Sequence, residues 1–218
     1  MLLGITMHQH INTVPNYVSP LVCEAIINNV SIEHVYEQGI MVINDDTPTN
    51  DFIIDRESRF VYSCSTFKQP EFINGIIQTI VSNVIEVDNQ CEVDYWEYPQ
   101  LLKYVVGGHY GQHCDAETYN EETQVWKRVT NRHLSLLLYL DAEYEGGELV
   151  FPKLNMVMTP KPGQIIVFPS NSNYVHGVRP LLSGTRHVLV CWLTVKGEPT
   201  VTPKPHGVVT NHMHYGIL

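Results

Sequence analysis

Apolar residues recur every three or four positions in the segment that begins at Pro70. The stripe consists of Phe72, Ile73, Ile76, Ile77, Ile80, Val81 and Val84. An α-helix places residues at this spacing on one side, so the pattern predicts an amphipathic helix that packs on a sheet or another helix. A second helix is expected from Pro20 to about Val30, because Ser19 suits an N-cap and proline suits the first helical position.

The pattern changes from about residue 101 onward to short apolar runs separated by turn residues. The predicted strands are Leu101–Val106, His133–Leu140, Glu148–Phe151, Gln164–Phe168, Tyr174–Val178 and His187–Val195. The turns between them are Gly146-Gly147, Pro162-Gly163 and Ser183-Gly184. Many short strands with distant partners indicate a mainly β (α+β) protein. We expect a double-stranded β-helix (jelly roll) with the N-terminal helices bracing one outer face.

A chain of 218 residues is long enough to bury one ordinary core, so we expect a single domain. Its expected parts are a helix-rich N-terminal support (1–95), the jelly-roll core (96–196) and an extended tail (197–218). The tail carries His212 and His214, which could bind a metal, although a mobile tail is the favoured interpretation.

The charge balance limits the possible partners. With 23 acidic and 13 basic residues the formal net charge is −10, which argues against a broad nucleic-acid surface. We see no signal-peptide pattern, and the apolar runs are too short to span a bilayer. The five cysteines include no CxxC pair, so we expect free thiols in a reducing compartment.

The most informative polar residues are His113 and Asp115, which stand two positions apart. On a strand such residues share a face, so both could bind one metal ion, while Cys114 would point to the opposite face. His176, from a distant strand, would complete two histidines and one carboxylate. This set occupies one face of an octahedral ferrous ion and leaves other positions open. Zinc accepts the same ligands and is the main chemical rival.

Several motifs surround these residues in a fixed order. They are Tyr104, Gly107, Tyr110, His113 and Asp115 (YxxGxxYxxHxD), Arg132 to Leu140 (RHLSLLLYL), Gly146-Gly147-Glu148, Phe168, His176, Gly184-Thr185-Arg186 and Trp192. Over about Leu101 to Val195 the chain resembles the prolyl 4-hydroxylase branch of the 2-oxoglutarate- and iron(II)-dependent dioxygenases. Because many motifs agree in order and spacing, the resemblance is specific.

The resemblance implies a role for each matching residue. His113, Asp115 and His176 would bind Fe(II). Arg186 would be a catalytic-site residue that binds the distal carboxylate of 2-oxoglutarate, since a planar guanidinium matches a carboxylate bidentately. Tyr104 would help to hold the same carboxylate.

The resemblance also implies a substrate groove lined by Tyr110, Arg132 and Trp192. A structural ion pair for Arg132 and core packing for Trp192 remain alternatives. The segment 116–131 is expected to be a mobile loop that closes over the substrate, with acidic residues that would favour a cationic peptide.

Two residues differ from the family pattern. Leu149 stands where threonine is frequent, which removes a possible hydrogen bond to the co-substrate. Ser135 replaces the usual threonine, which is a mild change. These differences leave the expected iron chemistry intact and bear only on the choice of substrate.

The implied function is hydroxylation of prolyl residues in a peptide or protein. It would use Fe(II), 2-oxoglutarate and O2, with ascorbate as a reductant, and would yield succinate and CO2. A proline-containing peptide would be the partner, with no nucleic acid or membrane involved, and a bacterial or viral protein acting in the cytoplasm fits best. The alternatives are the same chemistry on a free amino acid, small metabolite or alkylated base, and a jelly-roll module without activity.

Overall fold

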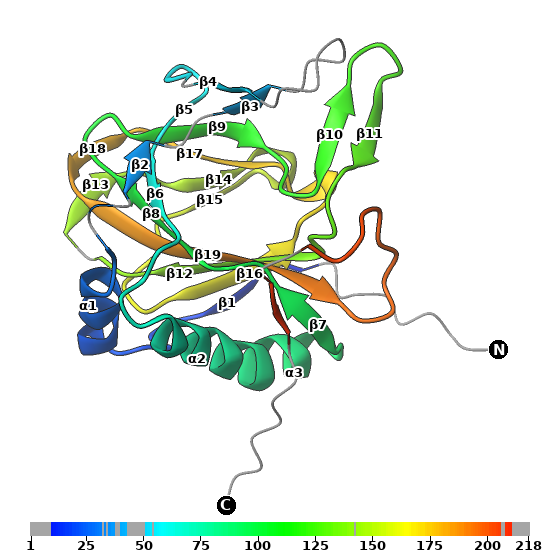
Figure 1. The fold of residues 1–218 in the computed structure, drawn as a ribbon. Coiled ribbons are helices and arrows are strands. Elements are labelled where there is room, and N and C mark those ends of the chain that lie inside the picture. The colour runs from blue at the N-terminus through cyan, green and yellow to red at the C-terminus, as the bar shows by residue number, and fades with distance from the viewer. Residues whose placement is uncertain are drawn as a thin grey trace, which may run out of the picture.

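Two facing antiparallel sheets form the body of the protein in a computed structural model (Figure 1). The structure describes residues 10–31, 33, 35–37, 40–42, 51–53, 55–141, 143–205 and 208–210. The nine-stranded sheet, here the major sheet, has the order β1-β16-β12-β19-β8-β6-β2, and β7 pairs with β19 and β20. Its strands are β1 (Asn12–Val14), β16 (Ile165–Pro169), β12 (Leu134–Tyr139), β19 (Arg186–Val195), β8 (Gln100–Tyr104), β6 (Tyr62–Cys64), β2 (Tyr36–Glu37), β7 (Val93–Trp96) and β20 (Val209–Thr210).

The five-stranded sheet, here the minor sheet, has the order β15-β14-β17-β9-β5. Its strands are β15 (Met156–Met158), β14 (Leu149–Phe151), β17 (His176–Val178), β9 (His109–His113) and β5 (Arg59–Phe60). Three two-stranded sheets complete the set: β10 (Glu117–Asn120) with β11 (Val125–Arg128), β13 (Tyr144–Gly146) with β18 (Leu181–Gly184), and β3 (Ile40–Val42) with β4 (Asp51–Ile53). Two 3-10 turns, η3 (Pro152–Leu154) and η4 (Ser172–Tyr174), lie between strands. This arrangement confirms the predicted jelly roll.

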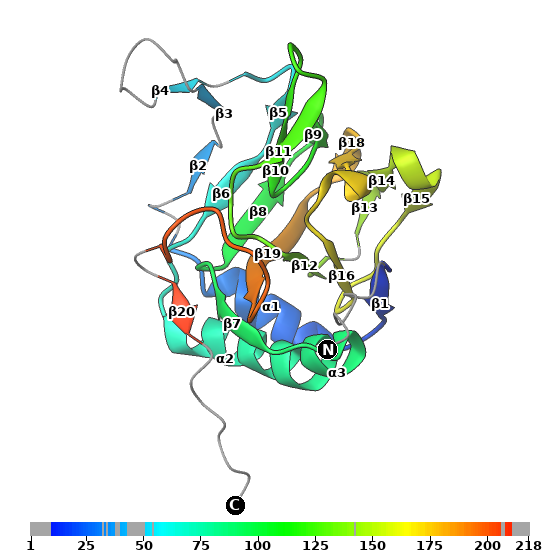
Figure 2. The same cartoon turned by 90° about the vertical axis from the view of Figure 1, so that its right-hand side faces the viewer.

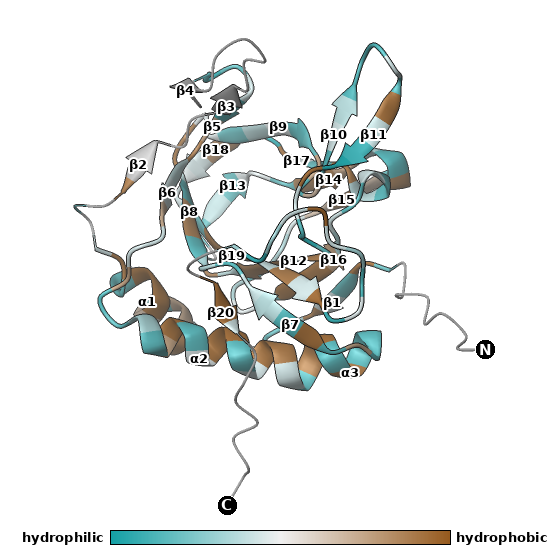
Figure 3. Cartoon of the chain, turned by 45° about the vertical axis from the view of Figure 1, so that its right-hand side comes forward, coloured by the Kyte–Doolittle hydropathy of each residue, from teal (hydrophilic) through white to brown (hydrophobic). Residues whose placement is uncertain are grey.

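The helices cover the outer face of the major sheet, with their apolar sides turned toward it (Figures 1 and 3). They are α1 (Pro20–Asn28), α2 (Pro70–Ile80), the π-helical turn η2 (Val81–Ile85) and α3 (Glu86–Asn89). The Ser19 hydroxyl accepts a hydrogen bond from the Val22 N–H, as expected of an N-cap. Both predicted helices are therefore confirmed. Among the described residues no helix is both long and apolar enough to cross a membrane.

The major sheet is buried on both faces, which explains why its central strands are apolar almost throughout. Alternate residues enter two different cores. The helix-facing core takes Leu134, Leu136 and Leu138 from β12 and Leu189, Cys191 and Leu193 from β19. The inner core, between the two sheets, takes Leu137, Tyr139, Val188, Val190 and Trp192 from the same strands. The site described below lies on this inner side.

The N-terminal part contributes more strand than the sequence pattern predicted. Besides the helices it supplies β1, which pairs with β16, β6, which pairs with β8, and β5, which pairs with β9. These strands have two or three residues each, too few to produce a recognisable alternation. The expected helix-rich support therefore also supplies strands to both sheets.

Two segments expected to be irregular are ordered. Half of the residues in segment 116–131 form the antiparallel pair β10–β11, which projects beside the minor sheet (Figure 2). The tail packs back on the core: the Asn131 side chain binds the backbone of Val201 and Thr202, and β20 pairs with β7. His212 and His214 lie outside the described residues.

Candidate active site

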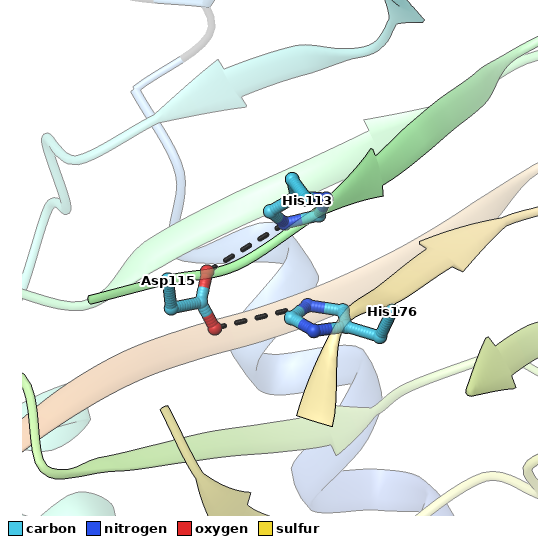
Figure 4. Close-up of side chains that lie close together, drawn as sticks. All are labelled: His113, Asp115 and His176. Atoms are coloured by element: carbon cyan, nitrogen blue, oxygen red, sulfur yellow. Dashed lines mark ion pairs between the residues drawn. The ribbon is translucent and has the colours of Figure 1, made fainter. Parts of the chain in front are cut away.

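Two histidines and one carboxylate meet at the edge of the inner core (Figure 4). His113 ends β9 and His176 begins β17, and the two residues face each other directly in the strand register. Asp115 Oδ1 lies 3.6 Å from His113 Nε2, and Asp115 Oδ2 lies 3.7 Å from His176 Nε2. The cluster was predicted, but its geometry differs in one respect. Strand β9 ends at His113, so Asp115 reaches the site from the following bend and not from the strand.

Both imidazole rings are oriented by backbone carbonyls. His113 Nδ1 lies 3.0 Å from the carbonyl oxygen of Gly111, and His176 Nδ1 lies 3.0 Å from that of Tyr174. A carbonyl only accepts, so each contact requires the proton on Nδ1 and leaves the Nε2 lone pair free. Both Nε2 atoms face Asp115. Metal-binding histidines are commonly oriented in this way.

The surroundings hold the cluster in the charge state that binds a metal. Phe151 and Phe168 pack against His176, with ring centroids 5.7 Å and 4.8 Å away. Burial, reinforced by nearby His113, lowers the pKa of His176 to about 4 although Asp115 opposes the shift. Burial alone would raise the pKa of Asp115, but His176 and His113 outweigh it and hold this pKa well below its usual range. The site therefore offers a neutral imidazole and an ionised carboxylate at neutral pH.

A short hydroxyl chain fixes the orientation of the carboxylate. Ser135 Oγ donates to Asp115 Oδ2 at 2.6 Å, and Ser135 Oγ lies 2.7 Å from Ser170 Oγ. Ser135 and Ser170 are both buried. The Cys114 thiol donates to the Ser170 carbonyl oxygen at 3.1 Å, and Cys114 does not belong to the metal-binding cluster. Ser135, noted above as a mild departure from the expected threonine, thus supplies this contact.

A cavity of about 240 Å³ opens beside the cluster. All the residues predicted for the site line it: Tyr104, Tyr110, His113, Asp115, Arg132, His176, Arg186 and Trp192. Sequence reasoning missed Arg59, Gln100 and Tyr139, which also line the cavity. Tyr139 lies four positions after Ser135 on β12, so both side chains are on the same face of the strand. This alternation could have predicted that Tyr139 faces the site. No signal in the sequence pointed to Arg59, which arrives through the pairing of β5 with β9.

Arg186 is a buried cation within this cavity. It is 1% exposed, and its Nε and Nη1 have no hydrogen-bond partner among the described residues. Its guanidinium lies over the rings of Tyr104, its cross-strand partner, and Tyr139, at 4.7 Å and 4.9 Å. Gly147 leaves room for it, since a Cβ there would lie 3.3 Å from Arg186 Cδ. A buried guanidinium with unpaired donors is costly, and a bound carboxylate would compensate it.

The residues predicted to line a substrate groove also line the cavity: Tyr110 next to His113, and Arg132 together with Trp192. Tyr110 stacks on His113, with ring centroids 3.8 Å apart and planes at 12°. Arg132 lies over the Trp192 ring at 3.7 Å. Arg132 also makes a bidentate ion pair with Glu97, with N–O distances of 2.6 Å and 2.7 Å. The structural ion pair considered for Arg132 therefore exists, and it holds the side chain at the cavity wall.

The donor set fits one intermediate divalent metal. Two neutral imidazoles and a carboxylate suit Fe(II) and also Zn(II), so the coordination atoms alone do not choose between them. The unpaired guanidinium of Arg186 in the same cavity adds a site for a carboxylate ligand. A metal and an anionic organic ligand could thus be bound in one cavity.

Comparison with known proteins favours Fe(II) over Zn(II) as the metal of this site. Residues 99–194 match the family model of the 2OG-Fe(II) oxygenase superfamily. A protein of Acanthamoeba polyphaga mimivirus, provisionally named prolyl 4-hydroxylase, is 28% identical over 129 residues, which cover 55% of this chain and 53% of that relative. The chain thus spans about half the length of this curated relative.

Solved structures agree in fold. The viral collagen prolyl hydroxylase of Paramecium bursaria Chlorella virus-1, solved with 2OG, has a TM-score of 0.58 at 19% identity, covering 87% of this chain and 98% of that one. A Trichoplax adhaerens prolyl hydroxylase in complex with a hypoxia inducible factor peptide fragment has a TM-score of 0.58 at 14% identity, covering 86% of this chain and 84% of that one. Residues 99–194, somewhat less than half of the chain, thus carry its similarity to the 2OG-Fe(II) oxygenase superfamily.

Proposed function

We propose that this protein hydroxylates prolyl residues in a peptide or protein, using Fe(II), 2-oxoglutarate and O2 and releasing succinate and CO2. The observation that carries the proposal is one cavity lined by both the His113–Asp115–His176 cluster and the unpaired, buried guanidinium of Arg186. The relatives named as prolyl hydroxylases support the choice of proline. We assign His113, Asp115 and His176 as the metal ligands.

The co-substrate would bind with its distal carboxylate on Arg186. The Nε and Nη1 donors of this side chain are unpaired, and its geometry suits a bidentate carboxylate. Burial by itself would lower the pKa of Arg186, but Tyr139, Tyr104 and Tyr144 together raise this pKa by more. The net pKa lies above its usual value, so the guanidinium remains charged. Tyr104 lies under the guanidinium, and burial raises the pKa of its hydroxyl, which therefore stays protonated and able to donate.

When bound, the iron and 2-oxoglutarate supply the oxidising chemistry that inserts one oxygen atom of O2 into a C–H bond. The side chains around them control what reaches that centre. Apolar residues of the inner core, Leu102, Leu137, Leu149, Val188 and Val190, line the cavity and exclude water. Leu149 offers no hydrogen bond to the co-substrate, so its recognition depends on Arg186 and the neighbouring tyrosines.

The substrate groove is assigned to Tyr110, Arg132 and Trp192. Aromatic faces and a fixed guanidinium are suited to an extended peptide that contains proline. Arg132 is held in place by Glu97, so it presents a preorganised donor at the wall. The acidic residues Glu121 and Glu122 lie in the turn between β10 and β11 and so remain candidates for contacts with a longer peptide.

Three further assignments belong to this proposal. The five cysteines are all free thiols, which supports action in a reducing compartment such as the cytoplasm. Ascorbate would serve as the reductant that restores Fe(II). The chain is proposed to work as a single domain, because the N-terminal segment and the tail both pair with the jelly-roll strands.

The test begins without oxygen. Fe(II) followed by 2-oxoglutarate should produce a weak visible absorption band that needs both additions and is lost in Arg186→Ala. Adding O2 and a library of proline-containing peptides should then give products one oxygen heavier at proline, identified by mass spectrometry. Oxidation only of other residues or of free amino acids would move the assignment to a different substrate class. Absence of the band, with iron binding shown separately, would contradict oxygenase activity altogether.

A further inference from the structure

Arg59 lies at the cavity wall next to the metal cluster. It comes from β5, at the opposite end of the minor sheet from β15, and its direct cross-strand partner is Tyr110. Tyr110 in turn stacks on His113. Arg59 is therefore only one side chain away from the metal ligands.

The guanidinium of Arg59 is only partly satisfied. Its Nη1 donates to the Tyr110 hydroxyl at 2.7 Å, and its Cζ lies 5.2 Å from the centre of the Tyr110 ring. Its Nε is buried and has no hydrogen-bond partner among the described residues. A guanidinium carries five N–H donors, and a buried donor without an acceptor is energetically costly. A ligand that accepts from Arg59 would remove this cost.

The other charged groups of the cavity are already matched. Arg132 is neutralised by Glu97. Asp115 faces the two histidines, and Arg186 is assigned to the 2-oxoglutarate carboxylate. Arg59 makes no ion pair with any carboxylate in the described part of the chain. The loaded site would therefore retain one uncompensated positive charge, and it would lie beside Tyr110.

We propose that Arg59 recognises a carboxylate on the peptide substrate close to the residue that is oxidised. This inference rests on the proposed function and specifies its substrate class: a peptide that carries an aspartate or glutamate, or its own C-terminal carboxylate, next to the target. A guanidinium binds a carboxylate bidentately, and the pair gains strength in a partly buried site. Arg59 is thus a specificity-determining residue, whereas the acidic turn between β10 and β11 lies outside this contact.

A purely positioning role for Arg59 makes a different prediction. If it only held the Tyr110 ring on His113, its loss would weaken every peptide equally. If it binds a carboxylate, its loss removes only the preference for the charged peptide. The two roles can therefore be separated by comparing peptides and not by the size of the effect.

The experiment measures, by anisotropy and without oxygen, binding of fluorescein-labelled, proline-containing peptides to the protein loaded with Fe(II) and 2-oxoglutarate, so that Arg186 is already occupied. The peptides carry aspartate, asparagine or lysine on either side of the proline, and a further pair ends next to proline in a free carboxylate or an amide. The wild type should bind the best aspartate or free-carboxylate peptide about tenfold more tightly than its neutral counterpart. Arg59→Gln should abolish that ratio, and Arg59→Glu should favour lysine.

Two matched variants complete the design. Arg56→Gln removes a charge from the same segment, but Arg56 does not line the cavity, so the preference should persist. Tyr110→Phe removes the hydroxyl that occupies Arg59 Nη1, and the preference for a carboxylate should likewise persist. Equal binding of charged and neutral peptides by the wild type, or an equal loss for all peptides in Arg59→Gln, would overturn the inference.

The same peptides distinguish this inference from the proposed function. Hydroxylation of proline without any preference for a neighbouring carboxylate would support the function and refute the role of Arg59. A preference in binding that depends on Arg59, with no oxidation at proline, would support carboxylate recognition and refute prolyl hydroxylation.

Discussion

The two faces of the major sheet differ in what they do, although the same strands form both. On the helix-facing side, Leu136, Leu189 and Leu193 pack in an apolar core with no exposed surface. On the inner side, Arg186 and Trp192 of β19 line a cavity and include buried donors without partners. Both faces bury apolar side chains, but the ligand-binding cavity lies only on the inner one. Mutations on the two faces should separate effects on stability from effects on ligand binding.

The largest effect is expected for Asp115→Ala. Two neutral imidazoles remain, but the anionic ligand is lost, so iron affinity and turnover should fall by more than about 100-fold, since even partners beyond the direct ligands contribute about 10–100-fold. The carboxylate lies outside the apolar cores, so the folded structure should persist. Iron titration, succinate release and a thermal melt measure these three quantities. Unchanged turnover would rule out Asp115 as a metal ligand.

Arg186→Met tests how a residue of the inner face affects the stability of the ligand-free protein and the affinity for 2-oxoglutarate. The substitution replaces a buried, unpaired charge by an apolar side chain, so the ligand-free protein should be as stable as the wild type or more stable. The affinity for 2-oxoglutarate should fall by about 30-fold or more, because truncating a buried charge partner costs about 2–5 kcal/mol. Calorimetry without and with 2-oxoglutarate measures both effects. Iron binding in the absence of 2-oxoglutarate serves as the control and should not change.

Leu136 and Leu137 are neighbours on β12 that face opposite cores. Leu136→Ala should destabilise the protein by about 2–5 kcal/mol, as is typical of a fully buried leucine, and leave 2-oxoglutarate affinity nearly unchanged. Leu137 lines the cavity, so Leu137→Ala should cost less stability but alter ligand binding. Denaturant unfolding combined with ligand titration compares the pair. Similar stability losses for both variants would contradict the division between the faces.

Ser135→Ala is expected to have the smallest effect of the four. It removes the hydrogen bond from Ser135 Oγ to Asp115 Oδ2 without touching a metal ligand. Iron affinity should fall by about tenfold, because such partners orient the ligand. Ser135→Thr keeps the hydroxyl and should restore most of the affinity. If the alanine variant binds iron as tightly as the wild type, the hydroxyl chain does not position the carboxylate.

The sequence predicted the long elements well and the short ones poorly. The stripe from Phe72 to Val84 was recognisable because it spans several helical turns, and the apolar run in β12 was recognisable because both faces of the sheet are buried. Strand β9, His109–His113, is polar in most positions and was not among the predicted strands, although its motif residue His113 was singled out. The resemblance had predicted a loop where the pair β10–β11 lies. Glu117–Asn120 is largely exposed and has no apolar alternation that would have indicated a strand.

The candidate site residues could be predicted from the chain, because their types, order and spacing carry the chemistry of a metal site and a carboxylate site. How these residues come together depends on the fold. Strand pairing sets His113 opposite His176, Tyr104 opposite Arg186, and Arg59 opposite Tyr110. Such pairs join residues far apart in the chain, and their register depends on which face of each strand is buried. Arg59 could not be found from its neighbours in sequence, because its role depends on a partner that only the fold brings beside it.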